Sequence, residues 1–470
     1  MKKEAQLVMI PLSAMGHLAS SIEFAKLLTN HDHRLSITIL VIKHPHDDDA
    51  ARISSYTRSL SSSQRVHVIN LPECPLDPET PSSFQFQALV DNQKPNVRQI
   101  VSNLSGPPLA AFVVDMFCTS MIDVAKEFKV PSLVFYTSGA AYLSLMLHLH
   151  TLREQDNLDR SESKEFVIPG FLNRVPRTAL PSIVSKEVWD SFFMANGRGL
   201  KKADGIIVNS FEELESHAVH SFSNSPIPIY PVGPILNTSA NNNINTEILE
   251  WLDQQPRSSV VFLCFGSMGS FGEDQVKEIA NALENSGVRF LWSLRKPPIR
   301  GPGKPIFAPP SDYSVSELAA ALPAGFLDRT AGIGKVIGWA PQTQVLAHQA
   351  TGGFVSHCGW NSTLESIYCG VPIAAWPLYA EQQTNAFELV CELKMAVEVA
   401  LDYMDDFISA PNFLVTADRI EKGIRSVMEI DEETRKKVKE MSEKSRSTLS
   451  EGGCSYSYLG RLIDYIMEQV

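Results

Sequence analysis

The 470-residue sequence has no excess of basic residues, no long apolar run and no close pair of cysteines. A formal net charge of −12 argues against nucleic-acid binding, which normally needs a basic face. No apolar run reaches the roughly 18 residues that a membrane-spanning helix needs. The seven cysteines are scattered and odd in number, which favours reduced thiols over disulfides or a zinc site. We therefore expect a cytoplasmic protein with no nucleic-acid partner and no stable membrane insertion.

Two common nucleotide-binding patterns are also missing. Gly266, Gly269 and Gly272 do not have the G-x-G-x-x-G spacing, and the glycines at 332 and 334 precede a predicted strand instead of following one. The sequence has no Walker lysine pattern. A nicotinamide-dependent oxidoreductase is therefore the weaker of the alternatives kept below.

The sequence does contain short apolar runs that alternate with amphipathic stretches from end to end. The runs are rich in Val, Ile, Leu and Phe with little alternation, as in strands buried on both faces of a parallel sheet. Alternating strands and helices predict an α/β fold with doubly wound parallel sheets, and the length predicts two of them. The predicted strands are Leu7–Pro11, Ser36–Ile42, Val66–Leu71, Leu109–Asp115, Ser132–Tyr136, Ile206–Asn209, Val260–Phe265, Phe290–Leu294, Lys335–Gly338, Gly353–Ser356 and Ile373–Trp376.

A polar stretch that includes three consecutive asparagines separates the two halves. We take residues 237–247 as the linker, residues 1–236 as the first domain and residues 248–454 as the second. A proline-rich segment over 297–310 predicts a surface loop within the second domain. Lys2-Lys3 and the short apolar run after them imitate a signal peptide, but a first buried strand is the better interpretation.

Ligands of an open α/β sheet bind outside the carboxyl ends of its strands, so residues there are the first candidates. His17 follows the first strand, and a neutral imidazole can take a proton from a hydroxyl group. Asp115 ends another strand and can hydrogen-bond the second ring nitrogen of that histidine. Alone, His17 suits a helix start without a role and Asp115 suits a helix cap. Together they favour general-base catalysis.

The second half carries a cluster that suits a diphosphate. His357 precedes Gly359, and Asn361 and Ser362 begin the next helix, where N–H groups and the helix dipole attract anions. Glu365 lies on the same helix face and can accept both hydroxyls of a ribose. An Asn/Ser-capped helix with a solvated glutamate explains each residue singly but not the whole run.

Four further positions complete this candidate site. Ser267 follows a predicted strand in a glycine-containing turn and can add a donor to a phosphate. Trp339 can stack on a nucleobase while Gln342 binds polar groups, and Glu381-Gln382 suit the hydroxyls of a sugar. Trp376, by contrast, is interpreted as a core residue.

With these residues assembled, the window Trp339–Gln382 resembles the 44-residue signature of plant family 1 UDP-dependent glycosyltransferases. The likeness extends along the chain through Gly16-His17-Leu18, the segment 209–215 and the turn at 265–267. It implies a GT-B fold, in which two Rossmann-like domains face each other across a cleft. It also implies that the C-terminal helix, about 455–470, packs back on the first domain. One departure is Ser20, where many members have proline.

The resemblance assigns a role to each candidate. It implies inverting transfer with His17 as general base and Asp115 as its partner. The UDP-binding residues would be Ser267, Trp339, Ala340, Gln342, His357, Asn361, Ser362 and Glu365. The sugar-binding residues would be Thr137, Trp360, Glu381 and Gln382. Gln382 is the residue usual for glucose, so UDP-glucose is the expected donor and co-substrate.

We predict an O-glucosyltransferase that acts on a small hydrophobic acceptor such as a flavonoid, another phenolic or a terpenoid. Apolar and aromatic residues of the first domain would line the acceptor pocket, namely Phe86, Phe117, Tyr142, Met146, Phe192 and Phe193. No metal and no other cofactor is expected, since the acidic run 47–49 suits a solvated loop, and a monomer is expected. The alternative class is a non-catalytic nucleotide-sugar-binding protein of the same fold.

Overall fold

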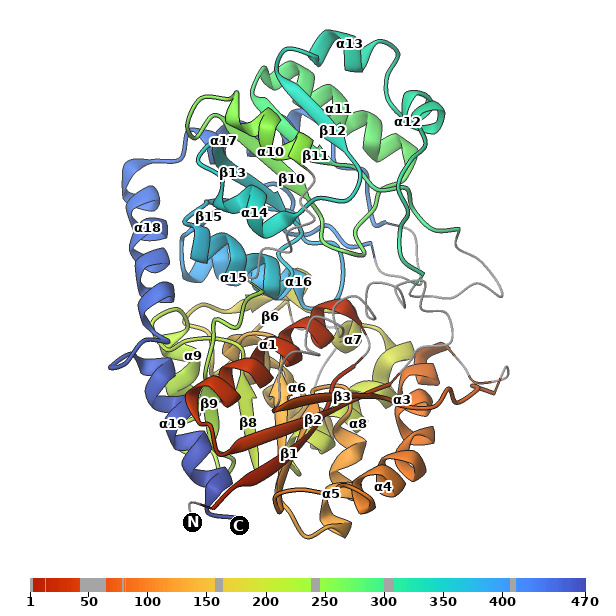
Figure 1. The fold of residues 1–470 in the computed structure, drawn as a ribbon. Helices are drawn as coiled ribbons and strands as arrows, with labels where there is room; N and C mark the ends of the chain where they lie inside the picture. The colour runs from red at the N-terminus through yellow and green to blue at the C-terminus, as the bar shows by residue number, and fades with distance from the viewer. Residues whose placement is uncertain are drawn as a thin grey trace.

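The computed structural model describes residues 3–12, 14–42, 65–77, 80, 82–156, 164–237, 246–299, 308–405 and 411–470. The chain forms two parallel sheets that face each other across the middle of the molecule, each flanked by helices on both sides (Figure 1). The predicted α/β architecture with two doubly wound domains is thereby confirmed. The predicted acidic loop at 47–49, most of the linker at 237–247 and part of the loop at 297–310 lie outside the described residues.

The first sheet has all of its strands parallel. Its order is β3 (Val66–Asn70), β2 (Leu35–Val41), β1 (Ala5–Ile10), β4 (Leu109–Asp115), β5 (Ser132–Tyr136), β8 (Gly205–Val208) and β9 (Ile229–Pro231). Within β1, Val8 and Ile10 join one buried cluster while Leu7 and Met9 join the cluster on the opposite face. The absence of polar alternation in these strands therefore reflects burial on both faces.

Helices and short turns cover both faces of this first sheet. They are α1 (Met15–His31), α3 (Ser82–Asn92), α4 (Lys94–Ser102), η1 (Thr119–Met121), α5 (Ile122–Glu127), α6 (Ala140–Glu154), η2 (Arg177–Ala179), α7 (Ser182–Ser185), η3 (Glu187–Trp189), α8 (Asp190–Leu200) and α9 (Ser216–Ser221). A small antiparallel pair, β6 (Glu165–Phe166) and β7 (Val175–Pro176), lies outside the main sheet.

The second sheet is also parallel. Its order is β12 (Gly334–Ile337), β11 (Arg289–Ser293), β10 (Val260–Cys264), β13 (Thr351–Ser356), β14 (Ile373–Ala375) and β15 (Ala396–Glu398). The helices around it are α10 (Thr246–Asp253), α11 (Glu273–Ser286), α12 (Val315–Ala321), α13 (Phe326–Thr330), α14 (Gln342–Ala347), α15 (Trp360–Cys369), α16 (Gln382–Phe387), the π-helix η4 (Glu388–Glu392) and α17 (Ala417–Met428).

Each sheet reverses its winding direction at one point. In the first sheet β1 lies between β2 and β4, and in the second β10 lies between β11 and β13. At such a switch point the crossover helices leave in opposite directions, which opens a crevice at the carboxyl ends of the two strands. The loops after β1, β4, β10 and β13 carry most of the predicted catalytic and diphosphate-binding residues.

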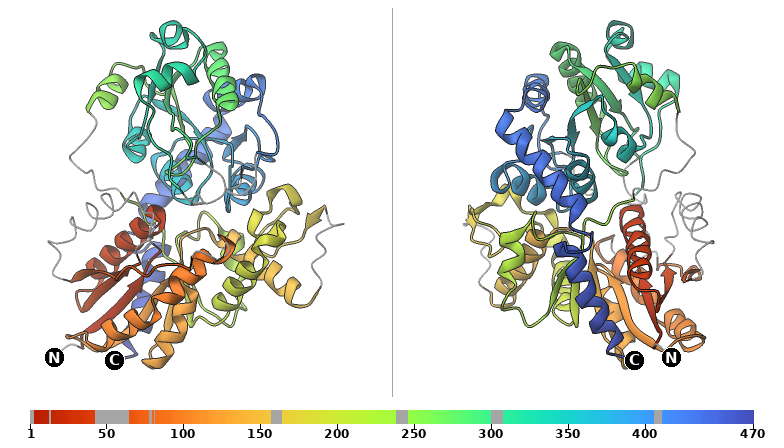
Figure 2. Two further views of the ribbon diagram at one scale, coloured as in Figure 1. Left: turned by 90° about the vertical axis from the view of Figure 1, so that its right-hand side faces the viewer. Right: turned by 60° about the vertical axis from the view of Figure 1, so that its left-hand side comes forward.

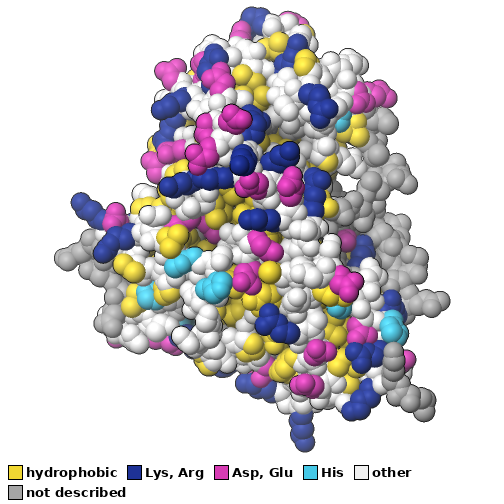
Figure 3. Space-filling model, turned by 90° about the vertical axis from the view of Figure 1, so that its left-hand side faces the viewer, with side chains coloured by type: hydrophobic (Ala, Val, Ile, Leu, Met, Phe, Trp, Pro, Cys, Tyr) yellow, Lys and Arg dark blue, Asp and Glu magenta, His cyan; other side chains and the backbone are white. Residues whose placement is uncertain are grey.

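The C-terminal helices join the two halves. Helix α18 (Glu432–Ser447) packs on the second domain through α15, whereas α19 (Cys454–Met467) buries Leu459, Leu462 and Ile463 against the first sheet. The two helices run along one side of the molecule and cross from one half to the other (Figure 2). On the face that carries them, acidic and basic side chains are interspersed (Figure 3).

Several edge elements have no counterpart in the predicted strands, whereas the central strands agree within two residues. β9 and β15 are three residues long and lie at sheet edges, which is too short for a periodic signal. The seven cysteines are free, and Trp376 is fully buried. Within the described part of the chain, no helix is both long and apolar enough to cross a membrane.

Candidate active site

The switch point of the first sheet brings His17 and Asp115 together. His17 Nδ1 lies 2.7 Å from Asp115 Oδ2 and 3.0 Å from Thr137 Oγ1. The Asp115 side chain is fully buried and also accepts a hydrogen bond from the Phe117 backbone N–H, whereas 22% of the His17 side chain is exposed. The carboxylate is thus fixed inside the protein, while the imidazole reaches the cleft.

This geometry selects one tautomer of His17. A carboxylate at Nδ1 holds the proton on that nitrogen, so Nε2 is left as the basic atom. Burial lowers the pKa of His17, but the charge and hydrogen bond of Asp115 and the charge of Glu381 outweigh burial and raise the pKa above its usual value. The arrangement can therefore accept a proton at Nε2 and stabilise the resulting imidazolium.

The second sheet places His357 at its own switch point, after β13. A Cβ atom on either Gly266 or Gly359 would come within 2.5 Å of His357 Nε2, so only glycine fits on both sides of this ring. Burial lowers the pKa of His357 to about 4, which leaves the imidazole neutral near pH 7. Among the described residues, His357 Nδ1 has no hydrogen-bond partner. Ser267 follows Gly266 in the same turn and is partly exposed.

Asn361 is the second residue of α15 and reaches across to the first domain. Its Nδ2 donates to the Gly16 carbonyl at 3.1 Å, and its Oδ1 accepts from Ser20 Oγ at 3.3 Å. The residue predicted for the diphosphate therefore also contacts the first turn of α1, the helix that carries His17. Ser20, named above as the departure from the resemblance, provides the hydroxyl for this contact.

Gln342, Ser362 and Glu365 form one hydrogen-bonded group. Gln342 Nε2 donates to Ser362 Oγ at 2.8 Å and to Glu365 Oε2 at 2.7 Å. Burial raises the pKa of Glu365, and hydrogen bonds from Gln342 and Thr343 oppose that rise. The three side chains from α14 and α15 are thus preorganised beside one another, as a ribose-binding group requires.

Trp339 lies two residues after the end of β12 and keeps 41% of its surface exposed, unlike the fully buried Trp376. The guanidinium of Arg295 lies 5.4 Å from the centre of the Trp339 ring. Arg295 is itself held by Asp312 at 2.9 Å and by the Pro310 carbonyl at 2.6 Å. The exposed indole can receive a flat ring, and Ala340 next to it is buried.

The predicted sugar-binding residues differ in their surroundings. Trp360 is buried, and its indole N–H donates to the Asn209 carbonyl of the first domain at 2.6 Å. Gln382 Oε1 accepts hydrogen bonds from the backbone N–H groups of Leu378 and Tyr379. These two bonds fix the orientation of the Gln382 side chain. Burial raises the pKa of Glu381, whereas its own backbone, the charge of His17 and the Trp360 backbone lower it. The charges of Glu381 and His17 thus act on each other, although they belong to different domains.

The aromatic residues predicted for the acceptor pocket divide into two groups. Phe117 lies 5.4 Å from the His17 ring, 6.1 Å from Phe86 and 5.7 Å from Phe192, measured between ring centres. Tyr142 and Met146 are buried on α6, and the charge of Glu381 adds to the burial that raises the pKa of Tyr142. Phe193 is fully buried beside His150, so its ring lies in the core rather than at the cleft.

Sequence reasoning missed Arg295 and the interdomain role of Asn209. Arg295 follows the carboxyl end of β11, so the rule that was applied to the other strand ends would have found it. The Asn209 carbonyl has no signal in the sequence, because any residue offers one. Among the described residues, no group of three or more His, Cys, Asp or Glu side chains is placed to hold a metal ion.

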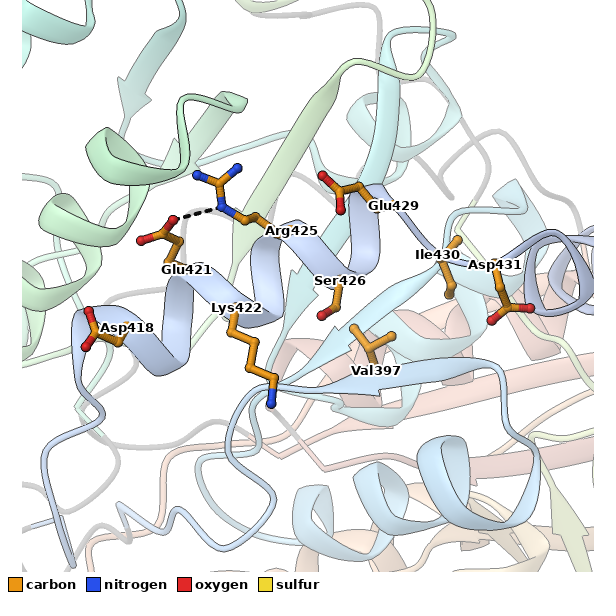
Figure 4. A pocket seen from close by; sticks show the side chains of 9 residues that line it. All are labelled: Val397, Asp418, Glu421, Lys422, Arg425, Ser426, Glu429, Ile430 and Asp431. Carbon is orange, nitrogen blue, oxygen red and sulfur yellow. Dashed lines mark hydrogen bonds and ion pairs between the residues drawn. The ribbon is translucent and has the colours of Figure 1, made fainter.

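A surface pocket of about 610 Å³ lies outside this cleft, against α17. Figure 4 shows its charged side chains, including Lys422 and the pair formed by Glu421 and Arg425. None of the predicted site residues lines it.

Comparison with known proteins shows the family and the solved structures that this chain resembles. Residues 182–419 match the family described as UDP-glucoronosyl and UDP-glucosyl transferase. The chain is 50% identical to UDP-glucose flavonoid 3-O-glucosyltransferase 6 of Fragaria ananassa, with 99% of each chain covered. A crystal structure of a UGT transferase from Siraitia grosvenorii in complex with UDP has a TM-score of 0.87 and 45% identity, covering 99% of this chain and 100% of that one. A Medicago truncatula structure complexed with UDP-glucose has a TM-score of 0.86 and 40% identity, covering 99% of both chains.

Proposed function

The chain belongs to the UDP-glucoronosyl and UDP-glucosyl transferase family, and from this premise we propose how its own residues perform glucosyl transfer. The donor is UDP-glucose, and the acceptor is a hydroxyl group of a small hydrophobic molecule. His17 removes the acceptor proton as the oxygen attacks the anomeric carbon, which is thereby inverted. The protein acts as a monomer in the cytoplasm.

One observation carries the catalytic part of this proposal, namely the pairing of His17 with a buried Asp115 at 2.7 Å. Asp115 orients the imidazole with Nε2 free and stabilises the positive charge that the ring gains when it accepts the proton. Thr137 Oγ1 at 3.0 Å from the same Nδ1 further restricts the ring. In this proposal Thr137 therefore helps to orient the imidazole of His17, in addition to any contact with the sugar.

The leaving UDP is stabilised by neutral donors and a helix dipole. The N-terminus of α15 directs backbone N–H groups toward the diphosphate, and His357 and Ser267 add side-chain donors. Trp339 stacks on uracil, with Ala340 and Gln342 beside it, while Glu365 accepts the ribose hydroxyls. Trp360, Glu381 and Gln382 border the glucose. Because these groups stabilise the negative charge that develops on the diphosphate, the proposed reaction needs no metal ion.

The acceptor is proposed to be a phenolic compound of the flavonoid class. The names of the Fragaria ananassa relative and of an anthocyanidin 3-O-glucosyltransferase from Manihot esculenta, 51% identical, support this class. The phenyl rings of Phe86, Phe117 and Phe192 give the side of the cleft near His17 an aromatic lining. Such a lining suits a flat apolar acceptor.

The test replaces His17 with alanine and measures UDP release from UDP-glucose with a panel of flavonols and simple phenols. General-base catalysis contributes about 10²- to 10⁴-fold, so kcat should fall by that factor. UDP binding, measured by calorimetry, should stay as in the unaltered protein, because His17 belongs to the other domain. Equal rates with and without EDTA are expected. Turnover of H17A at the normal rate would refute the base, and absence of transfer by the unaltered protein to every acceptor would refute the substrate class.

A further inference from the structure

A second pocket, of about 230 Å³, lies in the first domain between α3, η1 and α8. Phe117 and Phe192 both line it. Since Phe117 also contacts the His17 ring at 5.4 Å, this residue is common to the pocket and to the catalytic cleft. Complete small-molecule sites usually measure roughly 300–1,000 Å³, so this pocket has room for only part of a ligand.

Two of the residues that line this pocket carry buried polar atoms without a hydrogen-bond partner in the described part of the chain. Asn196 is only 4% exposed, and its Nδ2 donates to the Met116 carbonyl at 2.5 Å, which fixes the orientation of the amide. Its Oδ1 has no hydrogen-bond partner among the described residues, and the same is true of Ser120 Oγ. Both residues line the pocket. A buried unpaired acceptor is costly, so this oxygen is suited to a ligand that donates a hydrogen bond.

The rim of the pocket disfavours a cationic ligand. Lys94 pairs with Asp91 at 2.9 Å and reaches Asp123 at 3.8 Å. Arg198 and Lys202 also line the pocket, and neither forms an ion pair within the described part of the chain. The lining thus carries three basic side chains against the two acidic ones, Asp91 and Asp123, which favours a neutral or electron-rich ligand.

We propose that this pocket is a distal acceptor subsite, which takes a hydroxylated aromatic ring remote from the hydroxyl that receives glucose. The inference rests on the proposed function and makes its acceptor more specific. The ring packs against the phenyl groups of Phe117 and Phe192, and its hydroxyl donates to Asn196 Oδ1 with Ser120 Oγ as second partner. Acceptors with a hydroxyl on the remote ring are therefore preferred over those without one.

The experiment compares kcat/KM for two flavonols that differ only in a hydroxyl on the ring remote from the glucosylated position. The unaltered protein should prefer the hydroxylated flavonol by about tenfold, the discrimination expected from one buried hydrogen bond. In Ser120→Ala and Asn196→Ala the preference should fall toward one, while KM for UDP-glucose stays unchanged. Ser102→Ala, at an exposed position at the end of α4, is the matched control and should keep the preference.

A preference that is absent in the unaltered protein, or unchanged in both Ser120→Ala and Asn196→Ala, would overturn the subsite. If Asn196→Ala does not fold, Ser120→Ala alone decides, since it removes only one oxygen. Binding of catechol, followed by calorimetry, separates this inference from the proposed function. Catechol binding that Ser120→Ala weakens supports the subsite even if no acceptor is glucosylated, and catechol that does not bind refutes it.

Discussion

At the residue scale, the two site histidines are opposites in chemistry although both follow a central strand. His17 has a carboxylate at Nδ1 and a raised pKa, so it can exchange a proton near neutral pH. His357 lies between two glycines, and burial lowers its pKa to about 4, so it remains neutral. The first suits a base, and the second suits a neutral hydrogen-bonding group beside a phosphate. The neighbouring groups thus give two identical side chains different chemical roles.

Replacing Asp115 with asparagine should lower both the rate and the pH at which activity begins. A base must be deprotonated to act, so kcat/KM falls as the pH drops below the His17 pKa. Without the carboxylate, burial becomes the dominant influence on His17, and its pKa should decrease. We expect the acid limb of the pH–rate profile to move to lower pH and the maximal rate to fall about a hundredfold or more. An unchanged acid limb in Asp115→Asn would contradict the assigned pair.

At the scale of elements, the turns between strands and helices form the donor site. The turn after β10 and the start of α15 both pack closely against the His357 ring. They can do so because Gly266 and Gly359, the residues that contact the ring, have no side chain. Gly266 also has a φ of 74°, a left-handed conformation that glycine adopts without steric cost. The diphosphate site therefore depends on close backbone approach as much as on functional groups.

Replacing Gly359 with alanine should weaken donor binding. The added Cβ would come within 2.5 Å of His357 Nε2 and displace the imidazole. Overpacking of this kind costs about 1–3 kcal/mol, so Kd for UDP should rise by about fivefold to a hundredfold. Gly272→Ala is the matched control, because Gly272 also precedes a helix and its added Cβ meets nothing within 4 Å. Calorimetry with UDP measures both variants, and equal affinities would contradict the tight fit.

At the scale of the whole molecule, the two domains meet through polar contacts from α15, α16 and η4. Thr384 Oγ1 donates to the Ala179 carbonyl at 2.7 Å, and Glu392 accepts from the backbone of Leu172 and Asn173. Glu388 meets Glu215, whose carboxylate accepts the N–H groups at the start of α6. These contacts fix the position of Glu381, next in the chain to α16, relative to His17.

The Glu215–Glu388 pair should make the stability of the folded protein depend on pH. Burial, followed by the negative charge of Glu215, raises the pKa of Glu388 well above its usual value of 4.5. A raised carboxyl pKa means that the folded protein keeps a proton that the unfolded chain loses. The stabilisation is thus present at low pH and is lost as the pH rises from 4.5 through the folded-state pKa.

We therefore expect Glu388→Gln to remove part of this pH dependence, because an amide does not titrate. Between pH 5.5 and 8.5 the melting temperature of the unaltered protein should fall by a few degrees more than that of the variant. Glu250→Gln, the same change at an exposed position of α10 away from this pair, should change the melting temperature equally at both pH values. If the melting temperatures of Glu388→Gln and of the unaltered protein change by the same amount between these pH values, the inference that the pair holds a proton is contradicted.

The central strands, the α/β class and the family signature at 339–382 could be predicted from the sequence, because they follow from local apolar runs and from residues close along the chain. Leu109–Asp115 and Ser132–Tyr136 coincide with the observed strands, and 339–382 contains every residue of the Gln342–Ser362–Glu365 group. The division at 237–247 stays a prediction, since 238–245 lie outside the described residues.

Contacts between distant groups depend on the tertiary structure, and strand-end reasoning from the sequence anticipated one of them, the pairing of His17 with Asp115. His17 and Asp115 are 98 positions apart, and their contact depends on β1 pairing with β4 at the switch point. The contact of Asn361 with Gly16 and the pairing of Glu388 with Glu215 depend on how the domains meet. Sheet order and domain packing arise from the sum of many weak long-range contacts, and no local pattern in the chain records them.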